Sequence, residues 1–410
     1  NFTYCINPET GNFTHHTSYH KQADIEMEGE VIVDGNQLTL KSKEGKDKII
    51  SSLSSDVVLP NTQFYYYLLE DFCNTDLKEK TYNLYDPRAG EISESTYYKI
   101  GEEDLNLNGE IYQAMKFSQK DNTSGLETVF WIDKNDGMRL KMESQSRLAM
   151  YITDSRVKTK IKKGSWDDVI FIKTNEKIWD IRNITSMKVK VDMDPIPVPH
   201  IEDLSVKGQT FTGSIENGKM AGIFEIKREN YAGKNAASFP FDEANYTDLE
   251  VYLNASSSIE SDESVLIELS RRITSGSKDV WEASHRLAKW VADTIDGAIL
   301  SGTALQTFNR KKGDCGSQSF LMAALCRASG IPARVAYGPM YTREYDGSFG
   351  SHGWNEIFMG KAGWISIDVT LDETDYIDAG HIRLGIIDGF HTVLNYNNIE
   401  ILDFEIGKLR

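Results

Sequence analysis

The chain has 410 residues, of which 40% are hydrophobic and 26% are charged, a composition typical of a folded protein. It carries 45 Lys and Arg against 62 Asp and Glu, a net charge of −17 that disfavours nucleic acid as a partner, because phosphate binding needs clustered cations. Apolar runs stay shorter than the roughly 18 to 20 residues that cross a bilayer, so no membrane-spanning segment is predicted. The length predicts two or three domains.

Residues 1–192 are predicted to form a β-rich, antiparallel sheet domain, with a half-barrel as one form it can take. From about residue 25, apolar and polar residues alternate in short stretches separated by turn pairs, which is the hairpin pattern. The turn pairs are Asp34-Gly35, Asn108-Gly109 and Asp136-Gly137. The aromatic run Phe64 to Phe72 breaks the alternation and is interpreted as a core helix on the sheet, with the lip of a groove as the alternative.

A proline-rich stretch marks the next boundary. "DMDPIPVPHIED" holds three of the nine prolines, so residues 193–203 are predicted to be a stiff linker. Residues 204–255 follow as a small β-rich segment, with strands expected in "GIFEIKRE" and "YTDLEVYL". From residue 256 to 410 helical spacing appears, first in "SVLIELSRRI" and then in "DVWEASHRLAKWVADTI", where Asp279 is placed to cap the helix.

A cysteine stands at the start of the next predicted helix, 315–329. Gly313-Asp314 precede it and Ser329-Gly330-Ile331-Pro332 end it, with a buried stripe expected at Leu321, Ala324, Leu325 and Ala328. Cys315 then lies in the first turn, where free N–H groups and the helix dipole stabilise an anion, as a thiol nucleophile requires. Cys326 would lie about 16 Å along the axis, beyond the ~7 Å that a disulfide spans, and is predicted to be core. Whether Cys5 and Cys73 form a disulfide stays open.

A base and an orienting acid follow the cysteine. His352 lies in the glycine-rich stretch "DGSFGSHGWNEIFM", and Asp368 ends the apolar strand "GWISIDV". If residues 354–359 and 363–369 pair as a hairpin, His352 and Asp368 lie near the same end of it. A Cys-His-Asp triad needs that placement. Spacing alone leaves open that both are ordinary residues of an acidic protein.

These segments resemble the transglutaminase-like superfamily of cysteine enzymes over about residues 260–385. The resemblance rests on Gly-Asp-Cys at a helix start, "RASGIPAR" at its end, "HGWNE", and "GWISIDVT" with its acidic residue; "TLDETDYIDAGHIRL" is similar to the tail of bacterial members. It implies an α+β fold in which the cysteine helix packs on an antiparallel sheet, preceded here by antiparallel β-rich domains, and it implies Cys315, His352 and Asp368 as catalytic residues.

The resemblance further implies amide chemistry through a thioester, without a cofactor or metal. Its oxyanion donors would be the Cys315 backbone N–H and one further group, for which Gln306 and Asn309 are candidates. Hydrolysis of a protein, peptide or other amide is favoured over protein-glutamine cross-linking, and a catalytically retired binding or assembly protein of the cell envelope is the alternative from another class. The chain begins at Asn1 rather than Met, which favours an extracytoplasmic bacterial protein, periplasmic or secreted, with a lipid anchor on a removed segment left open.

Other residues are interpreted as structural rather than catalytic. Arg334 is expected to pair with a carboxylate beneath the site, and Trp354 and Trp364 to pack around the hairpin. The acidic residues Asp368, Asp372, Asp375 and Asp378 lack the ligand order of a calcium loop and are interpreted as a solvated loop. A metal site at His15, His16 and His20 is judged less favourable than a mobile N-terminal segment, His285 is expected to be structural, and His381 and His391 receive no assignment.

Overall fold

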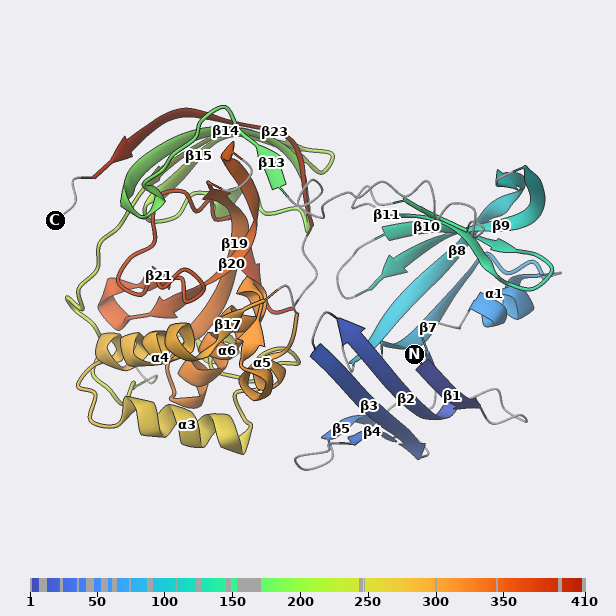
Figure 1. Cartoon of the computed structure of the whole chain (residues 1–410), viewed down its shortest axis with the longest axis horizontal. Coiled ribbons are helices and arrows are strands. Elements are labelled where there is room, and N and C mark those ends of the chain that lie inside the picture. Colours follow the sequence, from blue (N-terminus) through green and yellow to red (C-terminus); the bar gives the residue numbers. More distant parts are fainter. Residues whose placement is uncertain are drawn as a thin grey trace. The chain divides into compact units, whose positions relative to one another are not determined.

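A computed structural model provides the fold (Figure 1). It describes residues 2–6, 13–22, 25–34, 37–41, 48–52, 58–60, 65–73, 75–86, 91–107, 109–122, 127–144, 149–152, 171–242, 246, 248–298, 301–343, 346–389 and 393–407. The chain forms two compact units, Asn1–Lys162 and Lys163–Arg410. The fold is α+β, with helices and a high content of antiparallel strands, as the sequence predicts.

The described strands of the first unit form two sheets rather than one. The first has the order β1-β2-β3-β4-β5, and the second β12-β11-β10-β9-β8-β7-β6. Their bounds are β1 (Phe2–Ile6), β2 (Phe13–Gln22), β3 (Ile25–Asp34), β4 (Gln37–Lys41), β5 (Lys48–Ser52), β6 (Val58–Pro60), β7 (Glu79–Asp86), β8 (Glu91–Leu107), β9 (Glu110–Asp121), β10 (Glu127–Asp133), β11 (Arg139–Ser144) and β12 (Ala149–Tyr151). All neighbours are antiparallel except β6 and β7, which pair in parallel.

The predicted hairpins are present in these sheets. Strands β3 and β4, β8 and β9, and β10 and β11 pair antiparallel on either side of the three turn pairs. Within those pairs, Gly35 and Asn108 lie outside the described residues. Most of the aromatic run forms helix α1 (Tyr65–Phe72), whose Leu68 and Phe72 are fully buried against β-sheet aromatics. It is therefore part of a core, as predicted.

The second unit begins earlier in the chain than the proline-rich stretch does. Strand β14 (Ile184–Ile196) lies between β16 (Lys219–Lys227) and β23 (Val393–Ile406), and β15 (Gln209–Glu216) completes the sheet β15-β16-β14-β23. Residues 184–192, expected in the N-terminal domain, and residues 193–196, expected in the linker, thus belong to this sheet. The reason is long-range pairing: β23 comes from the end of the chain and pairs with β14 along almost its whole length, a contact that local alternation does not reveal.

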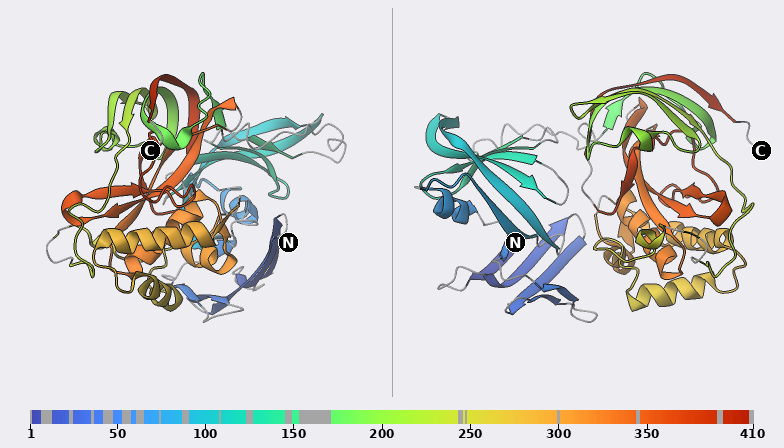
Figure 2. Two further views of the ribbon diagram at one scale, coloured as in Figure 1. Left: turned by 60° about the vertical axis from the view of Figure 1, so that its left-hand side comes forward. Right: turned by 180° about the vertical axis from the view of Figure 1, so that it is seen from behind.

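A helical layer covers one face of a second sheet in this unit. The helices are α3 (Ser264–Thr274), α4 (Val280–Thr294), α5 (Ala304–Arg310) and α6 (Cys315–Ala328), and the strands are β13 (Phe171–Lys173), β19 (Ala333–Thr342), β20 (Ser348–Phe358), β21 (Trp364–Ile367) and β22 (Gly385–Ile387). Two short segments, β17 (Asp296–Gly297) and β18 (Lys312–Gly313), pair in parallel. In Figures 1 and 2, β19 and β20 run from the helices at one end to the curved β14–β23 sheet at the other.

Some local predictions for the second unit are confirmed and others are wrong. Asp279 caps α4 by accepting the Glu282 N–H at 2.8 Å, as predicted. The "YTDLEVYL" strand is wrong, because Glu250–Tyr252 form a 3-10 turn. Helix α6 is buried on every side from residue 317 to 327 rather than along one stripe, since α3, α4 and α5 pack on it from one side and the sheet from the other. Ala328, expected in the stripe, is only partly buried.

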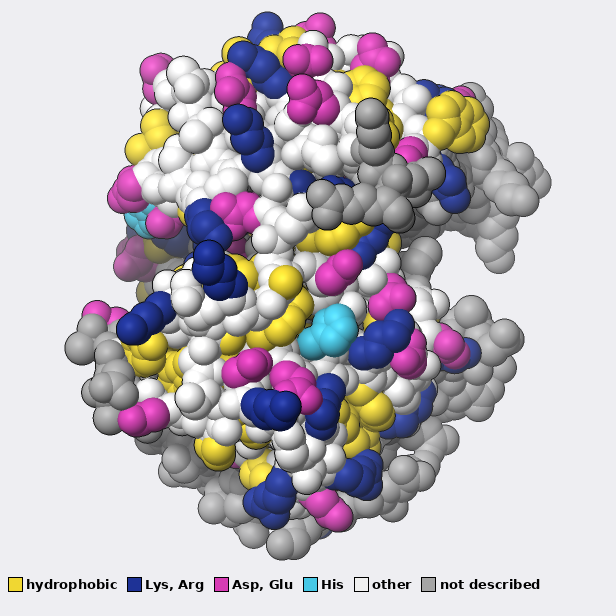
Figure 3. Space-filling view, turned by 90° about the vertical axis from the view of Figure 1, so that its left-hand side faces the viewer, with side chains coloured by type: hydrophobic (Ala, Val, Ile, Leu, Met, Phe, Trp, Pro, Cys, Tyr) yellow, Lys and Arg dark blue, Asp and Glu magenta, His cyan; other side chains and the backbone are white. Residues whose placement is uncertain are grey.

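The four cysteines are all free thiols, so Cys5 and Cys73 do not form a disulfide in this structure. Cys326 is fully buried, as predicted for a core residue. A search of the described helices finds none that is long and apolar enough to span a membrane. On the face in Figure 3, the described Lys and Arg side chains alternate with Asp and Glu side chains, so this face carries mixed charge despite the net charge of −17.

Candidate active site

Helix α6 holds Cys315 at its first residue. Asp314 caps the helix: its Oδ1 accepts the Ser317 N–H at 2.8 Å and the Ser317 hydroxyl at 2.6 Å, and its Oδ2 accepts the Ser301 hydroxyl at 2.7 Å. A Cβ on Gly313 would lie 2.8 Å from the Ser317 Cβ, so glycine is needed just before the cap. The Cys315 N–H has no intrahelical acceptor, because the first N–H groups of any helix lack one. The helix start therefore offers a donor and a positive dipole end beside the thiol.

Buried polar contacts join α6 to strand β20. The Ser319 hydroxyl donates to the Gly353 carbonyl at 3.1 Å, and the Asn355 side-chain amide donates to the Ser319 carbonyl at 2.8 Å. Both contacts lie in the buried part of the unit. They set the helix in register with the strand that carries His352.

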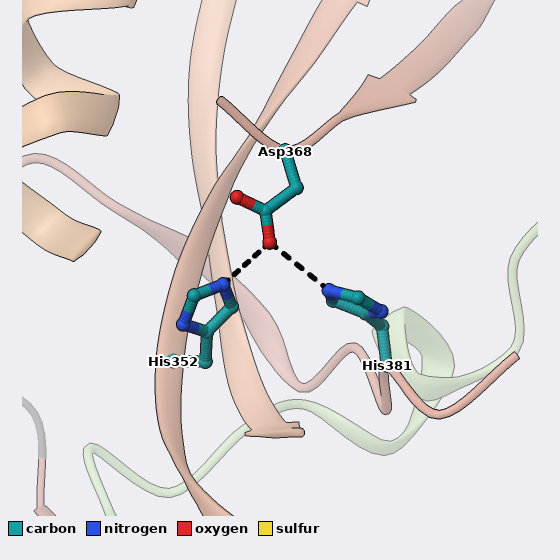
Figure 4. A group of neighbouring side chains, drawn as sticks. All are labelled: His352, Asp368 and His381. Atoms are coloured by element: carbon teal, nitrogen blue, oxygen red, sulfur yellow. Dashed lines mark hydrogen bonds and ion pairs between the residues drawn. The ribbon is translucent and has the colours of Figure 1, made fainter. Parts of the chain in front are cut away.

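His352 and Asp368 are brought together by the β20–β21 hairpin, which the sequence predicts. Phe358 pairs with Trp364 across the turn, and Asp368 follows the end of β21. The His352 Nε2 lies 2.6 Å from the Asp368 Oδ2 (Figure 4). The other oxygen, Oδ1, accepts the Thr370 N–H at 2.8 Å. This contact engages the Nε2 of His352 and not its other ring nitrogen, Nδ1.

The buried charges of this group stabilise one another. Burial disfavours the imidazolium form of His352, but the Asp368 carboxylate and the Cys315 thiol outweigh it and raise the pKa of His352. Burial likewise disfavours the charged carboxylate, and His352 and His381 outweigh it and lower the pKa of Asp368. Asp368 is fully buried and His352 is 8% exposed, so solvent screens this pair little. These effects together favour the imidazolium form of His352.

A second histidine, His381, contacts the same carboxylate oxygen. Its Nε2 lies 3.2 Å from the Asp368 Oδ2, on the other side of the oxygen from His352 (Figure 4). The sequence analysis missed it. It comes 13 residues after Asp368 in a segment without regular periodicity, so only the path of the chain reveals the contact.

The two predicted oxyanion candidates, Gln306 and Asn309, both lie in helix α5. Gln306 takes part in the capping box of α5, where its Oε1 accepts the Thr303 N–H at 3.2 Å. Asn309 is exposed. Among the described residues, no hydrogen bond joins either side chain to Cys315.

Two groups of buried side chains have ligand atoms close enough to hold a metal ion. They are His352, Asp368 and His381, and Glu373, Asp378 and His381, with all ligand atoms within 4.8 Å of one another in each group. Arg182 lies 3.2 Å from the Glu373 carboxylate. Burial and the neighbouring Asp378 carboxylate raise the pKa of Glu373 to about 8, against the opposing effect of His381 and Arg182.

The acidic residues expected to form a solvated loop divide into two kinds. Asp368 and Asp378 are buried, while Asp372 and Asp375 are exposed. Asp372 pairs with Lys289 at 3.1 Å, and Asp375 pairs with Arg182 at 2.5 Å. The N-terminal histidines lie in β2, where His15 pairs with Glu30 at 2.8 Å. That segment is a strand in the structure and does not form a histidine metal cluster among the described residues.

The remaining residues named in the sequence analysis form ion pairs and packing contacts. Arg334 pairs with Glu356 at 2.6 Å, as expected, and Arg383 pairs with the same carboxylate at 2.7 Å. Trp354 is buried and stacks beside His352 with ring centroids 6.3 Å apart, and Trp364 lies under the Arg334 guanidinium. His285 packs on Trp281 and contacts the Thr374 carbonyl at 3.2 Å. His391 lies outside the described residues.

Comparison with known proteins places this site within a recognised domain. Residues 267–369 match the family model of the transglutaminase-like superfamily. No curated protein matches the chain. Similar solved structures include a candidate cysteine protease from Cytophaga hutchinsonii, with 15% identity, 58% of this chain and 92% of that chain covered, and a TM-score of 0.40.

Two further structures are similar. They are the periplasmic domain of TgpA from Pseudomonas aeruginosa, with 13% identity over 57% of this chain and 81% of that chain and a TM-score of 0.32, and a candidate protease from Parabacteroides distasonis, with 9% identity over 71% and 69% and a TM-score of 0.21. Cys315 and His352 lie within the matched residues, and Asp368 is the last but one of them. Residues 267–369 of this chain are a transglutaminase-like domain.

Proposed function

We propose that this protein is a cysteine-dependent amide hydrolase in which Cys315 is the nucleophile, His352 the general acid and base, and Asp368 the group that orients His352. The observation that carries the proposal is the contact of 2.6 Å between His352 and a fully buried Asp368, on the strand held against the capped helix of Cys315. An anionic helix-start thiol beside an imidazolium is the form of cysteine that attacks carbonyl carbons.

The reaction proceeds in two balanced steps. The Cys315 sulfur attacks the amide carbonyl carbon, the C–N bond breaks, and the His352 Nδ1 proton goes to the departing amine, which leaves a thioester. Neutral His352 then takes a proton from water, the oxygen attacks the thioester, and the carboxylic acid leaves as the sulfur regains its charge. Asp368 holds the Nε2–H throughout and so selects the tautomer in which Nδ1 faces the thiol.

The oxyanion of each tetrahedral intermediate would accept a hydrogen bond from the Cys315 backbone N–H. One donor of this kind contributes about 2.7 to 4 kcal/mol to stabilising a transition state. Of the two side chains considered as a second donor, Gln306 remains the better, because its Nε2 is a donor while its Oε1 serves the α5 cap and Asn309 is exposed.

The substrate class and the location follow from the same proposal. Substrates are amides of proteins, peptides or similar molecules, and the protein acts outside the cytoplasm. TgpA, to which the chain is similar, is represented by a periplasmic domain. Hydrolysis is proposed over amine transfer on the resemblance to simple bacterial members, and a glutamine peptide offered with an amine dye separates the two. Hydrolysis would convert the glutamine side chain to glutamate and leave the dye unbound, whereas cross-linking would attach the dye to the peptide. Dye incorporation would therefore favour cross-linking over hydrolysis.

A short iodoacetamide pulse followed by intact-mass measurement tests the nucleophile. At pH 6 the wild type should gain one label, Cys315→Ala none, and His352→Ala much less than the wild type. Cys326 is buried and serves as an internal unreactive thiol. An unlabelled wild type below pH 8 would contradict the proposal and favour a retired site in a binding or assembly protein.

A further inference from the structure

The segment that carries His381 runs along strand β19 and is fixed there. Its backbone hydrogen bonds are Tyr341 N–H to the Gly380 carbonyl at 3.0 Å, Ile382 N–H to the Pro339 carbonyl at 2.9 Å and Leu384 N–H to the Tyr337 carbonyl at 2.9 Å. A Cβ on Gly338 would lie 1.8 Å from the Ile382 carbonyl oxygen, so only glycine admits the segment at this distance. Gly338 is also the β19 partner of His352. The pairing therefore delivers His381 to the same place on the sheet as His352.

Both ring nitrogens of His381 face oxygen acceptors. Nε2 faces the Asp368 Oδ2 at 3.2 Å, and Nδ1 faces the Asp378 carbonyl at 3.2 Å and its Oδ1 at 3.5 Å. An oxygen of a carboxylate or carbonyl only accepts, so a ring whose two nitrogens meet such oxygens is satisfied by two N–H groups. The geometry therefore fits an imidazolium ion, and the buried carboxylates also raise the pKa of His381 against the effect of burial.

The charged groups around His381 come from four parts of the chain. Asp368 follows β21, Glu373 and Asp378 lie in the loop after it, His352 lies in β20, and Arg182 pairs with Glu373 from the 3-10 turn before β14. The ring centroids of His352 and His381 are 5.7 Å apart. Two cations thus share one carboxylate oxygen in a site where the carboxylate and both rings are shielded from solvent.

We propose that His381 is a positioning residue of the reaction: as a fixed imidazolium it holds Asp368 in place and takes part of its charge, which keeps His352 acidic enough to protonate the departing amine. This inference rests on the proposed function. A carboxylate that served His352 alone would stabilise its proton more strongly and so hinder its transfer to the amine. When His381 shares the oxygen, its positive charge lowers the pKa of the nearby His352 imidazolium, because like charges disfavour each other. The proton of His352 is then transferred more easily to the amine.

The variant that tests this is His381→Gln, which keeps an N–H donor toward Asp368 and removes the charge. His285→Gln is the matched control, since His285 is a partly buried histidine outside the cluster. In ¹⁵N-histidine-labelled protein, His381→Gln should move the Nε2–H resonance of His352 downfield at pH 6.5 and raise the titration midpoint of His352 by roughly one pH unit, as expected for removing a charge about 6 Å away.

Two results would overturn the proposal. One is a His352 resonance and midpoint in folded His381→Gln that equal those of the wild type and of His285→Gln. The other is a wild-type spectrum in which His381 carries a single N–H between pH 5 and 8; this spectrum decides the matter even if His381→Gln does not fold.

The two proposals fail in different ways. Iodoacetamide labelling of Cys315 is measured on the same samples, so an unreactive thiol refutes the hydrolase proposal while the state of His381 is read independently. A reactive thiol with a neutral His381 refutes only the present inference.

Discussion

The Ser319 hydroxyl donates to the Gly353 carbonyl at 3.1 Å and so ties helix α6 to strand β20 one residue beyond His352. The Asn355 amide donates to the Ser319 carbonyl at 2.8 Å and is a second such bond between helix and strand. Apolar packing between the two elements does not by itself specify a register to within a fraction of a turn. Buried hydrogen bonds do, because each one left unmade costs about 1 to 3 kcal/mol. The geometry at Cys315 thus depends on residues that do not react.

Asp314 should support both the helix and the thiol. Replacing Asp314 with Ala should lower the free energy of unfolding by about 1 to 2 kcal/mol and reduce the labelling rate of Cys315 at pH 6, because the first turn loses its anchor. Asp279→Ala, which removes an equivalent cap from α4, should cost similar stability without changing the labelling rate. Urea unfolding and alkylation kinetics measure the two effects, and equal labelling of both variants would contradict the expectation.

Asp368→Asn should reduce amide turnover by roughly 10³- to 10⁴-fold, because an amide in this position donates as well as accepts and no longer selects the tautomer with Nδ1 facing Cys315. Substrate binding should change little, since Asp368 is fully buried and does not reach a substrate. Steady-state kinetics should show the loss in kcat with KM nearly constant. A rise in KM with an unchanged kcat would indicate a different function for Asp368.

The buried ion pairs predict how stability depends on pH. The lowered pKa of Asp368 gives stability that is present above its unfolded value of about 3.9, while the raised pKa of His352 gives stability that is full below about 6.5 and is lost as pH rises toward its folded value of about 10. The melting temperature of Asp368→Asn should lie roughly 10 °C below that of the wild type near pH 6. This difference in melting temperature should narrow toward pH 10, and scanning calorimetry from pH 6 to 10 measures it. A difference that stayed constant over this range would show that the buried ion pairs do not cause it.

Gly338→Ala should displace the segment that carries His381. The added Cβ would meet the Ile382 carbonyl at 1.8 Å, so the backbone must separate, at a cost expected to exceed about 3 kcal/mol. Gly353→Ala is the matched control, because its Cβ would make only ordinary contacts from 3.7 Å outward. Thermal unfolding of the two variants compares them, and similar melting temperatures would show that the close approach at Gly338 does not constrain the segment.

The local elements of this site follow from short-range signals in the sequence. The Gly-Asp-Cys start and Gly-Ile-Pro end set the bounds of α6 to within a residue, and the glycine-flanked turn between Phe358 and Trp364 set the hairpin that joins His352 to Asp368. The turn pairs of the first unit predicted its hairpins in the same way. These features depend on capping, turn conformation and periodicity, which act over a few neighbouring residues.

How distant segments meet could not be predicted from these local signals. The pairing of β14 with β23, about 200 residues apart in the chain, moved the start of the second unit to before the proline-rich stretch. The passage of residues 380–384 along β19 placed His381 on Asp368, and packing on every side buried α6. The physical reason is the same in each case: contacts between remote segments depend on long-range pairing and on side-chain volume at the meeting point, such as the missing Cβ of Gly338, and a periodic local pattern carries no record of either.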